Sequence, residues 1–207
     1  MTHISNAISE AVIEALKKEV FIPVEASGRH VHLNAVDAAI LFGEGYEFTK
    51  IKELSQPGQY ACKERVSIVG PKGTLNNVIV LGPLRKDTQI EVSSTDALVL
   101  GINAPLRQSG EIVDTPGITI RNGEKKVNVK QGLIVAKRHV HMTPEDAVKF
   151  NVKDGESVKV KVSGERPVIF EETVVRVHKN FRTFMHIDYD EANCCGYNKE
   201  SFGIILK

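Results

Sequence analysis

The sequence predicts a mainly β protein that contains an internal duplication. Short apolar or alternating stretches recur along most of the chain between Pro, Gly and Asn turn signals, a pattern typical of barrels and sandwiches. Few stretches have helical periodicity. The tetrapeptide Arg29-His30-Val31-His32 occurs again 109 residues later as Arg138-His139-Val140-His141, and a helix start follows each copy. We therefore expect one strand-and-helix unit, used twice, in two interlocked halves.

Strands are expected wherever short apolar or alternating runs are bounded by turn residues. These runs begin after the first twenty residues and continue almost to the last residue of the sequence. Their ranges are 21–27, 66–70, 77–82, 88–93, 118–121, 126–129, 132–136, 157–162, 168–177 and 203–206.

Helices are expected over 5–19, 35–42 and 144–150, with a further turn near 95–100. The first of these is amphipathic, because apolar residues at spacings of three and four form a single stripe. The stripe consists of Ile8, Val12, Ile13 and Leu16.

Each histidine pair is followed by residues that can start a helix. Asn34 and Thr143 can each accept hydrogen bonds from the first free amides of the helix after them. Pro144 suits a first helical position. Asp37 and Asp146 suit the first turn, where the helix dipole favours negative charge. The repeated unit is therefore a strand with His-x-His and then a capped helix.

Composition places the chain among globular proteins. Its 207 residues are 42% hydrophobic, enough for a core, and the formal net charge is +1 with no run of five like charges. This balance argues against a polyanion-binding surface as the main feature of the chain. No stretch is long and apolar enough for a membrane span, and no signal-peptide pattern is present at the start. We expect a cytoplasmic protein.

The three cysteines indicate a reducing compartment. Cys62, Cys194 and Cys195 are odd in number and two are adjacent, so a disulfide framework is not expected. None lies in a nucleophile signature, and small buried thiols are common. We expect structural roles for all three.

The duplicated element carries a pair of imidazoles. In a strand, residues two apart project from one face about 6.6 Å apart, so both rings of a pair can face one ion. Imidazole is the commonest zinc ligand, and a catalytic zinc usually has three protein ligands and one open position. Single histidines are more often structural, but packing gives no reason for both imidazoles in both copies. We expect metal binding, with third donors and supporting partners among Glu91, His186, Asp188, Asp190 and Glu191.

Two glycine-proline turns each present one cation. They are Gly70-Pro71-Lys72-Gly73 and Gly82-Pro83-Leu84-Arg85, and such turns can form a phosphate or nucleotide site. By itself this signal is weak, because similar turns more often only connect strands. Arg85 lies six residues before Glu91, near enough along a hairpin to place a guanidinium beside the metal as a substrate clamp.

With these residues assembled, the chain resembles the PduL family of phosphate acyltransferases, which are associated with bacterial microcompartments. The resemblance covers about residues 21 to 193 in the order of the family. It rests on the motifs Ser27–Leu33, Leu54–Ala61, Glu64–Val66, Val69–Gly73, Leu81–Arg85, Thr88–Ser93, Ala104–Gly110, Ala136–Met142 and Met185–Asn193.

The resemblance implies two interlocked β-barrels capped by short helices. Residues 21–28 plus 137–207 would form the first barrel. Residues 29–136 would form the second, with a short inserted sheet near 43–63. Residues 1–20 would precede both as an amphipathic helix.

The resemblance also implies a dinuclear zinc site between the barrels, with two Zn²⁺ per chain. One ion would be held by His30, His32 and Glu91, and the other by His139, His141 and His186. Arg85 would bind phosphate, and further catalytic positions match Gln89, Ser109 and Arg176.

Coenzyme A would be bound by a third group of residues. The implied contacts are Ala26, Ser27, Gly28, Lys72 and Asn193. The chain departs from the family pattern at Ile79, where many members have an arginine that helps to hold coenzyme A.

The implied reaction converts an acyl-CoA and phosphate into an acyl phosphate and free coenzyme A. The acyl-CoA would be propanoyl-CoA or acetyl-CoA. We expect phosphate to attack the thioester directly, without an acyl group on any cysteine. The ligands fit a zinc-dependent hydrolase of a thioester, ester or amide equally well, with water as the attacking group. A third reading is a non-catalytic barrel with structural zinc or a DNA-binding surface, and the near-neutral charge weighs against DNA.

The implied partners are coenzyme A or acyl-CoA and phosphate, with neither nucleic acid nor membrane. In this family an amphipathic N-terminal segment can direct the enzyme into a microcompartment through shell proteins, and residues 5–19 are compatible with that role. They are equally compatible with a helix packed on a barrel. The expected location is the cytoplasm, in the microcompartment lumen if the segment targets it, and the sequence allows an oligomer.

Overall fold

The computed structural model describes residues 20–206, so the predicted helix over 5–19 lies outside the described residues. The chain forms two compact units. Unit 1 comprises the chain up to Ala26, Arg138–Ile187 and the chain from Glu191 onward. Unit 2 comprises Ser27–Lys137 together with Asp188–Asp190.

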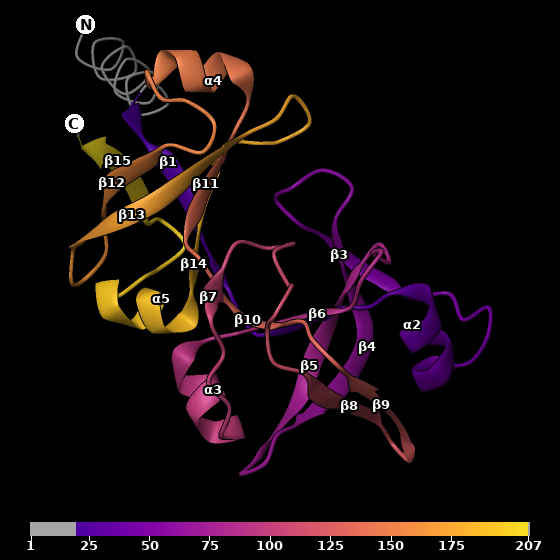
Figure 1. Ribbon diagram of the computed structural model, residues 1–207. Helices are drawn as coiled ribbons and strands as arrows, with labels where there is room; N and C mark the ends of the chain where they lie inside the picture. The colour runs from indigo at the N-terminus through magenta and orange to yellow at the C-terminus, as the bar shows by residue number, and fades with distance from the viewer. Residues whose placement is uncertain (1–19, 207) are drawn as a thin grey trace, which may run out of the picture. The chain divides into compact units, whose positions relative to one another are not determined.

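Unit 1 is built on a closed six-stranded barrel (Figure 1). Around the barrel the order is β1 (Ile22–Ser27), β14 (Phe184–Asp188), β11 (His139–Met142), β13 (Val168–Val177), β12 (Ser157–Val162) and β15 (Phe202–Leu206). Two helices belong to this part of the chain, α4 (Pro144–Lys149) and α5 (Tyr189–Cys195). The core is apolar and includes Ile22, Val140, Met142, Val160 and Met185.

Unit 2 is built on a nine-stranded sheet that does not close (Figure 1). The order is β7 (Leu106–Arg107), β10 (Leu133–Ala136), β6 (Gln89–Val92), β2 (His30–His32), β5 (Thr74–Gly82), β4 (Tyr60–Val69), β8 (Ile118–Asn122) and β9 (Lys125–Val129), while β3 (Lys50–Glu53) pairs with β4. Its helices are α2 (Ala35–Phe42) and α3 (Ser94–Leu100). The core includes Val31, Leu41, Ile68, Ile90 and Leu133.

The sequence repeat is also a repeat of strand topology. In unit 2, β2 lies between β6, which is antiparallel to it, and β5, which is parallel to it. In unit 1, β11 lies between β14, which is antiparallel to it, and β13, which is parallel to it. Each His-x-His strand is therefore the middle strand of the same three-strand arrangement. The prediction of a mainly β fold with an internal duplication is confirmed.

The helix starts after the histidine pairs are as predicted. The Asn34 side chain accepts a hydrogen bond from the Asp37 amide at 2.7 Å, and Thr143 accepts one from the Asp146 amide at 3.1 Å. Pro144 is the first residue of α4. These side chains satisfy amides that have no partner within the helix.

The prediction that no helix follows residue 150 was wrong, because Tyr189–Cys195 forms α5. The helical turn predicted near 95–100 is present as a complete helix, α3. The strand predicted over 66–70 begins earlier, at Tyr60, because β4 also pairs with β3. In residues 20–206, no helix combines the length and the apolar character needed to cross a membrane.

We expect Ser93→Ala to lower the free energy of unfolding by about 1 kcal/mol, because it removes the N-cap of α3. Ser93 Oγ accepts from the Asp96 amide at 3.2 Å, and the Asp96 carboxylate accepts from the Ser93 amide at 3.4 Å. Urea denaturation measures the loss. The matched control is Ser94→Ala, one residue further and exposed, and an equal loss in both variants would contradict the assignment.

Candidate functional site

The first donor cluster lies in unit 2, and we call it triad A. One ligand atom from each of His30, His32 and Glu91 lies within 4.8 Å of the others, and all three residues are buried. The strands β2 and β6 are antiparallel, with His30 opposite Glu91 and His32 opposite Gln89. Residues that face each other in a sheet project to the same side. This register places the carboxylate beside the imidazoles.

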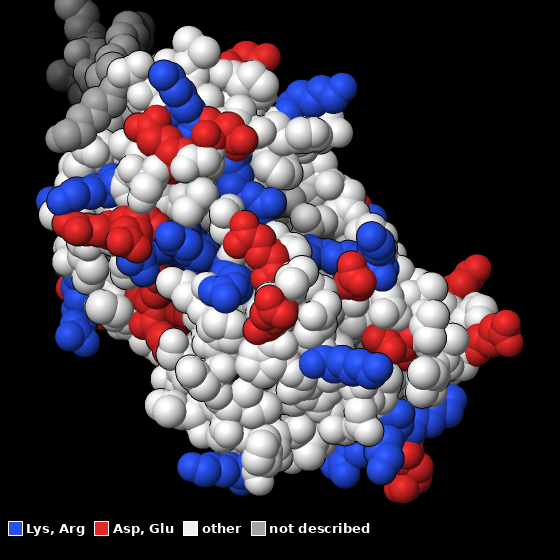
Figure 2. Space-filling view, in the orientation of Figure 1, with Lys and Arg blue, Asp and Glu red and all other residues white. Residues whose placement is uncertain are grey.

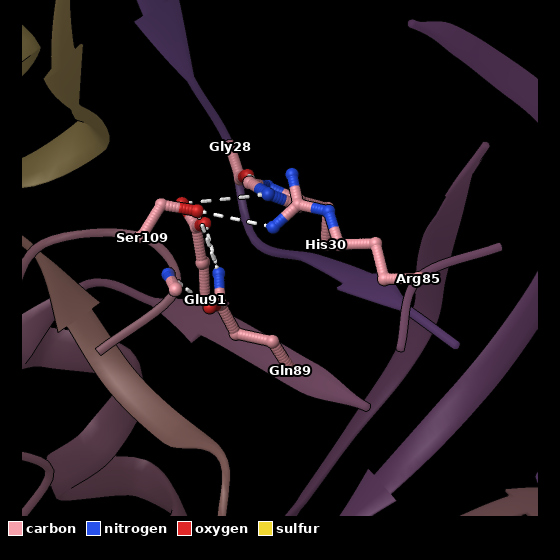
Figure 3. Close-up of polar contacts among 7 residues, drawn as sticks. Gly28, His30, Arg85, Gln89, Glu91 and Ser109 are labelled. Carbon is pink, nitrogen blue, oxygen red and sulfur yellow. Dashed lines mark hydrogen bonds and ion pairs between the residues drawn. The ribbon is translucent and has the colours of Figure 1, made fainter. Parts of the chain in front are cut away.

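The Gly28 carbonyl orients the His30 ring, and the Glu91 carboxylate lies near its other nitrogen (Figure 3). Its Nδ1 lies 2.8 Å from the Gly28 carbonyl oxygen, and its Nε2 lies 3.4 Å from Oε2 of Glu91. A carbonyl oxygen only accepts, so Nδ1 carries the proton and the neutral ring presents the lone pair of Nε2 to the triad. Gly28 has no room for a side chain, because a Cβ there would lie 2.9 Å from the Tyr189 ring.

Burial and mutual attraction shift the pKa values of His30 and Glu91 in opposite directions. Burial by itself would raise the pKa of the Glu91 carboxyl, but the facing His30 imidazole outweighs it and holds that pKa well below its usual range. Burial by itself would lower the pKa of His30, and the Glu91 carboxylate outweighs it and raises that pKa. Glu91 is therefore a buried anion that favours a positive partner.

His32 tests whether triad A suits a metal ion. Its Nδ1 is buried and has no hydrogen-bond partner in the described part of the chain. Burial, with repulsion from His30 and Arg85, holds the pKa of His32 well below its ordinary value, so the ring is neutral. A buried nitrogen without a partner costs about 1–3 kcal/mol, which coordination of a cation would offset. Two imidazoles and a carboxylate are donors that suit zinc, and these residues fit such an ion.

A chain of hydrogen bonds joins triad A to Arg85 (Figure 3). The side-chain amide of Gln89 donates to Oε1 of Glu91 at 2.5 Å and to Oγ of Ser109 at 2.9 Å. Nη1 of Arg85 donates to the same hydroxyl oxygen at 3.1 Å. The Gly110 amide donates to Oε1 of Gln89 at 2.7 Å, which fixes the orientation of the Gln89 amide. The structure thus brings together Arg85, Gln89, Ser109 and Glu91.

The second donor cluster lies in unit 1, and we call it triad B. Ligand atoms of His139, His141 and His186 lie within 4.8 Å of one another. The strands β11 and β14 are antiparallel, with His139 opposite His186. Nδ1 of His141 lies 3.2 Å from Nδ1 of His186. Two nitrogens bound to one tetrahedral zinc at ordinary distances are about 3.3 Å apart, so this spacing fits a shared ion.

Arg176 lies beside triad B. It is half-buried on β13, directly opposite His141 on β11. Paired residues share a face of the sheet, so the Arg176 side chain leaves the strand on the same face as the His141 side chain.

The residues predicted to bind coenzyme A are divided among several elements. Ala26 and Ser27 end β1, and Gly28 follows them. Lys72 lies in the turn between β4 and β5, packed so closely on Gly101 that a Cβ at Gly101 would lie 2.5 Å from its Cγ. Asn193 is exposed on α5. Ser27, Gly28 and Lys72 belong to unit 2, whereas Ala26 and Asn193 belong to unit 1.

Ile79 lies on the strand next to triad A. It pairs with His30 across β5 and β2 and is half-buried. The position at which the family pattern has arginine therefore adjoins the first histidine of this triad.

Each copy of the repeated tetrapeptide also ties its arginine to an acid. Nη1 of Arg29 lies 2.5 Å from Oδ1 of Asp96, and Nη1 of Arg138 lies 2.6 Å from Oε1 of Glu191. Each acid is five residues after the third donor of its triad. The two ion pairs therefore connect each histidine strand to the helix that follows the third donor.

Asp190 and Glu191, predicted as further donors or supporting partners, belong to neither triad. Asp190 accepts the Thr95 amide at 2.8 Å, and Glu191 is the partner of Arg138. The sequence prediction missed Glu25, whose Oε2 lies 3.2 Å from Nε2 of His186. The sequence feature that could have identified Glu25 is its position as the only acid in a strand whose alternate residues, Ile22 and Val24, are buried.

The charges on the face drawn in Figure 2 are mixed in sign. Lys and Arg side chains are interspersed with Asp and Glu over this face, and no continuous basic stripe crosses it. Nucleic acids are held largely by such stripes. This face therefore offers no surface of that kind.

Comparison with known proteins gives consistent matches over almost the whole chain. Residues 23–198 match the family described as phosphate propanoyltransferase. A phosphate propanoyltransferase of Clostridioides difficile (strain 630) is 58% identical over 207 residues, covering 100% of this chain and 99% of the relative. Proteins of the same name from Listeria monocytogenes and Enterococcus faecalis are 55% and 54% identical over 204 residues each. The alignments cover 99% and 98% of this chain and 95% and 97% of those relatives.

Two of the three cysteines are shielded from reagents. Cys62 and Cys195 are buried, whereas Cys194 is exposed. Burial raises the pKa of Cys62 to about 11 and also raises the pKa of Cys195. The thiolate is the nucleophilic form, so neither buried cysteine is an activated nucleophile.

We expect iodoacetamide at pH 8 to modify Cys194 first in the folded protein. With a pKa of about 11, only about one in a thousand Cys62 side chains is a thiolate at that pH. Peptide mass spectrometry at timed intervals measures each rate, and protein unfolded in guanidinium is the control in which all three react. Modification of folded Cys62 as fast as Cys194 would contradict the prediction.

Proposed function

Since this chain belongs to the phosphate propanoyltransferase family of acyltransferases, we propose that it transfers the acyl group of an acyl-CoA to inorganic phosphate. The substrates are propanoyl-CoA or acetyl-CoA, and the products are an acyl phosphate and free coenzyme A. The observation that carries the proposal is the hydrogen-bonded chain from Arg85 through Ser109 and Gln89 to Glu91. Through these hydrogen bonds, a guanidinium suited to bind an anion is linked to Glu91, one of the three side chains that could hold a metal ion.

In this proposal Arg85 binds phosphate. A guanidinium presents N–H donors in a fixed planar fork that matches the oxygens of phosphate. Ser109 accepts from Nη1 and so fixes one end of that fork. Gln89 in turn holds Ser109, and the Gly110 amide holds Gln89. The guanidinium is therefore oriented before substrate arrives, which reduces the entropy lost on reaching a reactive arrangement.

We propose that each triad holds one Zn²⁺, two per chain. His30, His32 and Glu91 would hold the first, and His139, His141 and His186 the second. Bound zinc supplies Lewis-acid polarisation of a carbonyl oxygen and affinity for a thiolate. The orphaned Nδ1 of His32 and the 3.2 Å spacing of His141 and His186 support these assignments.

The transfer itself needs no covalent acyl-enzyme. A phosphate oxygen forms a bond to the thioester carbonyl carbon, and the carbon–sulfur bond breaks to release the thiolate of coenzyme A. Arg85 holds phosphate for this attack, and Arg176 would stabilise negative charge beside triad B. The raised pKa of Cys62 and Cys195 supports a reaction in which neither of these two cysteines accepts the acyl group.

Coenzyme A is proposed to contact a separate set of residues, Ala26, Ser27, Gly28, Lys72 and Asn193. Lys72 would pair with phosphate groups of the cofactor, and the backbone near Gly28 would lie against it without a side chain in the way. Ile79 supplies no cation where many members have one, so these contacts would carry more of the binding.

We also propose that residues 1–20 direct the chain to the lumen of a bacterial microcompartment by binding shell proteins. Residues 1–19 of this segment lie outside the described residues, and its amphipathic sequence supports the proposal. Deleting residues 1–20 and following co-localisation with shell proteins would test it, since unaltered encapsulation would exclude this role.

We expect consumption of acyl-CoA to depend strictly on phosphate. We also expect this activity to be strongly reduced in Arg85→Lys. Lysine keeps the charge but loses the planar fork, so kcat/KM for phosphate should fall about 10²-fold. Thiol release with and without phosphate measures both effects. Arg121→Lys, an exposed arginine of unit 2, is the matched control. Equal thiol release without phosphate would instead identify a hydrolase.

Removal of the metal should abolish turnover. We expect dialysis against a chelator to release two equivalents of Zn²⁺ and to lower activity at least about 10²-fold, because both triads supply donors to the reaction. Activity should return when Zn²⁺ is added back. Metal analysis beside the thiol assay measures both quantities, and full activity of a metal-free preparation would contradict the proposal.

A further inference from the structure

The Glu25 carboxylate contacts one ring nitrogen of His186, while the other ring nitrogen lies close to His141 of triad B. Oε2 of Glu25, on β1, lies 3.2 Å from Nε2 of His186, on β14. These strands are neighbours in the closed barrel of unit 1. The His186 side chain is only 14% exposed and that of Glu25 is 36% exposed, so solvent screens the contact only in part.

This contact selects one tautomer of His186. A carboxylate accepts hydrogen bonds, so the Nε2 that faces Glu25 carries the proton. In the neutral ring, Nδ1 then carries the lone pair, and Nδ1 is the atom that lies 3.2 Å from Nδ1 of His141. With the opposite tautomer, an N–H group would point into the triad and could not bind a cation.

Triad A reaches the same result by a different route. There the Gly28 carbonyl fixes the His30 ring, and the negative charge is supplied by Glu91 inside the triad. Triad B consists of three imidazoles and contains no carboxylate. Glu25 places a negative charge next to the His186 ring, which strengthens the Nδ1 lone pair as a donor to a cation.

We propose that Glu25 is the positioning residue of triad B, which fixes His186 in the Nε2-protonated tautomer and so presents Nδ1 to the metal ion. This inference rests on the proposed function, because it takes triad B to hold a metal ion. Glu25 touches neither substrate nor metal in this role and acts through His186.

The test measures metal binding by the full chain after its metal has been removed. Titration with Zn²⁺ against a coloured chelator gives the affinity of each site. Wild-type protein should bind two equivalents. In Glu25→Ala, one equivalent should bind as in the wild type, and the affinity for the other should fall about 10- to 100-fold. Glu25→Gln keeps an acceptor oxygen without the charge, so its loss should be smaller.

Control variants separate a positioning role from a general effect on the barrel. Glu171→Gln removes an exposed acid from β13 of the same barrel and should leave both affinities unchanged. In a His186→Ala background, Glu25→Ala should have no further effect, because the two residues act as one unit.

A second readout reports the tautomer directly. In nitrogen-15 spectra of the metal-free protein, the wild-type His186 ring should show the proton on Nε2, and Glu25→Ala should show a substantial population with the proton on Nδ1. The His186→Ala spectrum identifies the signal. Thermal denaturation of each variant shows that the barrel is intact.

The possible failures are distinguishable. If wild-type protein binds two ions and Glu25→Ala binds both with unchanged affinity, this inference alone is overturned. An unchanged tautomer in Glu25→Ala would also overturn it. If wild-type protein binds no ion at all, the proposed metal dependence fails, and this inference fails with it.

Discussion

The pairing register of each histidine strand with the strand of its third donor is the constraint on which both triads depend. His30 faces Glu91, and His139 faces His186, so all donors of a triad project from one side of a sheet. A slip of one residue would turn the third donor to the opposite side. Apolar residues oppose such a slip, since Val31 and Val140 between the histidines are fully buried in the two cores.

The two halves have the same frame but different chemistry. In both, a backbone amide donates to the residue that follows His-x-His: Arg85 donates to Leu33 at 2.9 Å, and His178 donates to Met142 at 3.1 Å. Arg85 therefore occupies the place that His178 occupies in unit 1. Unit 2 has the longer connection there, which includes Gly82 and Pro83, and this connection carries the guanidinium that is bonded to Ser109. At this place the shared frame therefore carries a guanidinium in unit 2 and an imidazole in unit 1.

Local sequence signals predicted the features that depend on neighbouring residues. The His-x-His strands, the caps at Asn34 and Thr143 and most strand positions all follow from patterns within about ten residues. The order of strands does not, because it depends on pairings between distant segments such as Ile22 with Gly203. The helix α5 was missed because its short sequence, Tyr189–Cys195, has no strong apolar stripe.

The donor sets were predicted more completely than their surroundings. Glu91 and His186 could be chosen as third donors because carboxylates and imidazoles are side chains of the kinds that bind metal ions. Glu25 could not be connected with His186 from the sequence, because 161 residues separate them and only closure of the barrel brings them together. The same holds for Arg29 with Asp96 and for Arg138 with Glu191.

The division of the chain into units sets an order for folding during synthesis. Ribosomes release a protein from its N-terminus, so β1 emerges before residues 28–137 of unit 2 and long before its barrel neighbour β15. The strands of unit 2 are complete once Ala136 has emerged. In unit 1 the first neighbour of β1 to emerge is β14, at Phe184–Asp188, and the second is β15, so the barrel can close only after Phe202–Leu206 has emerged.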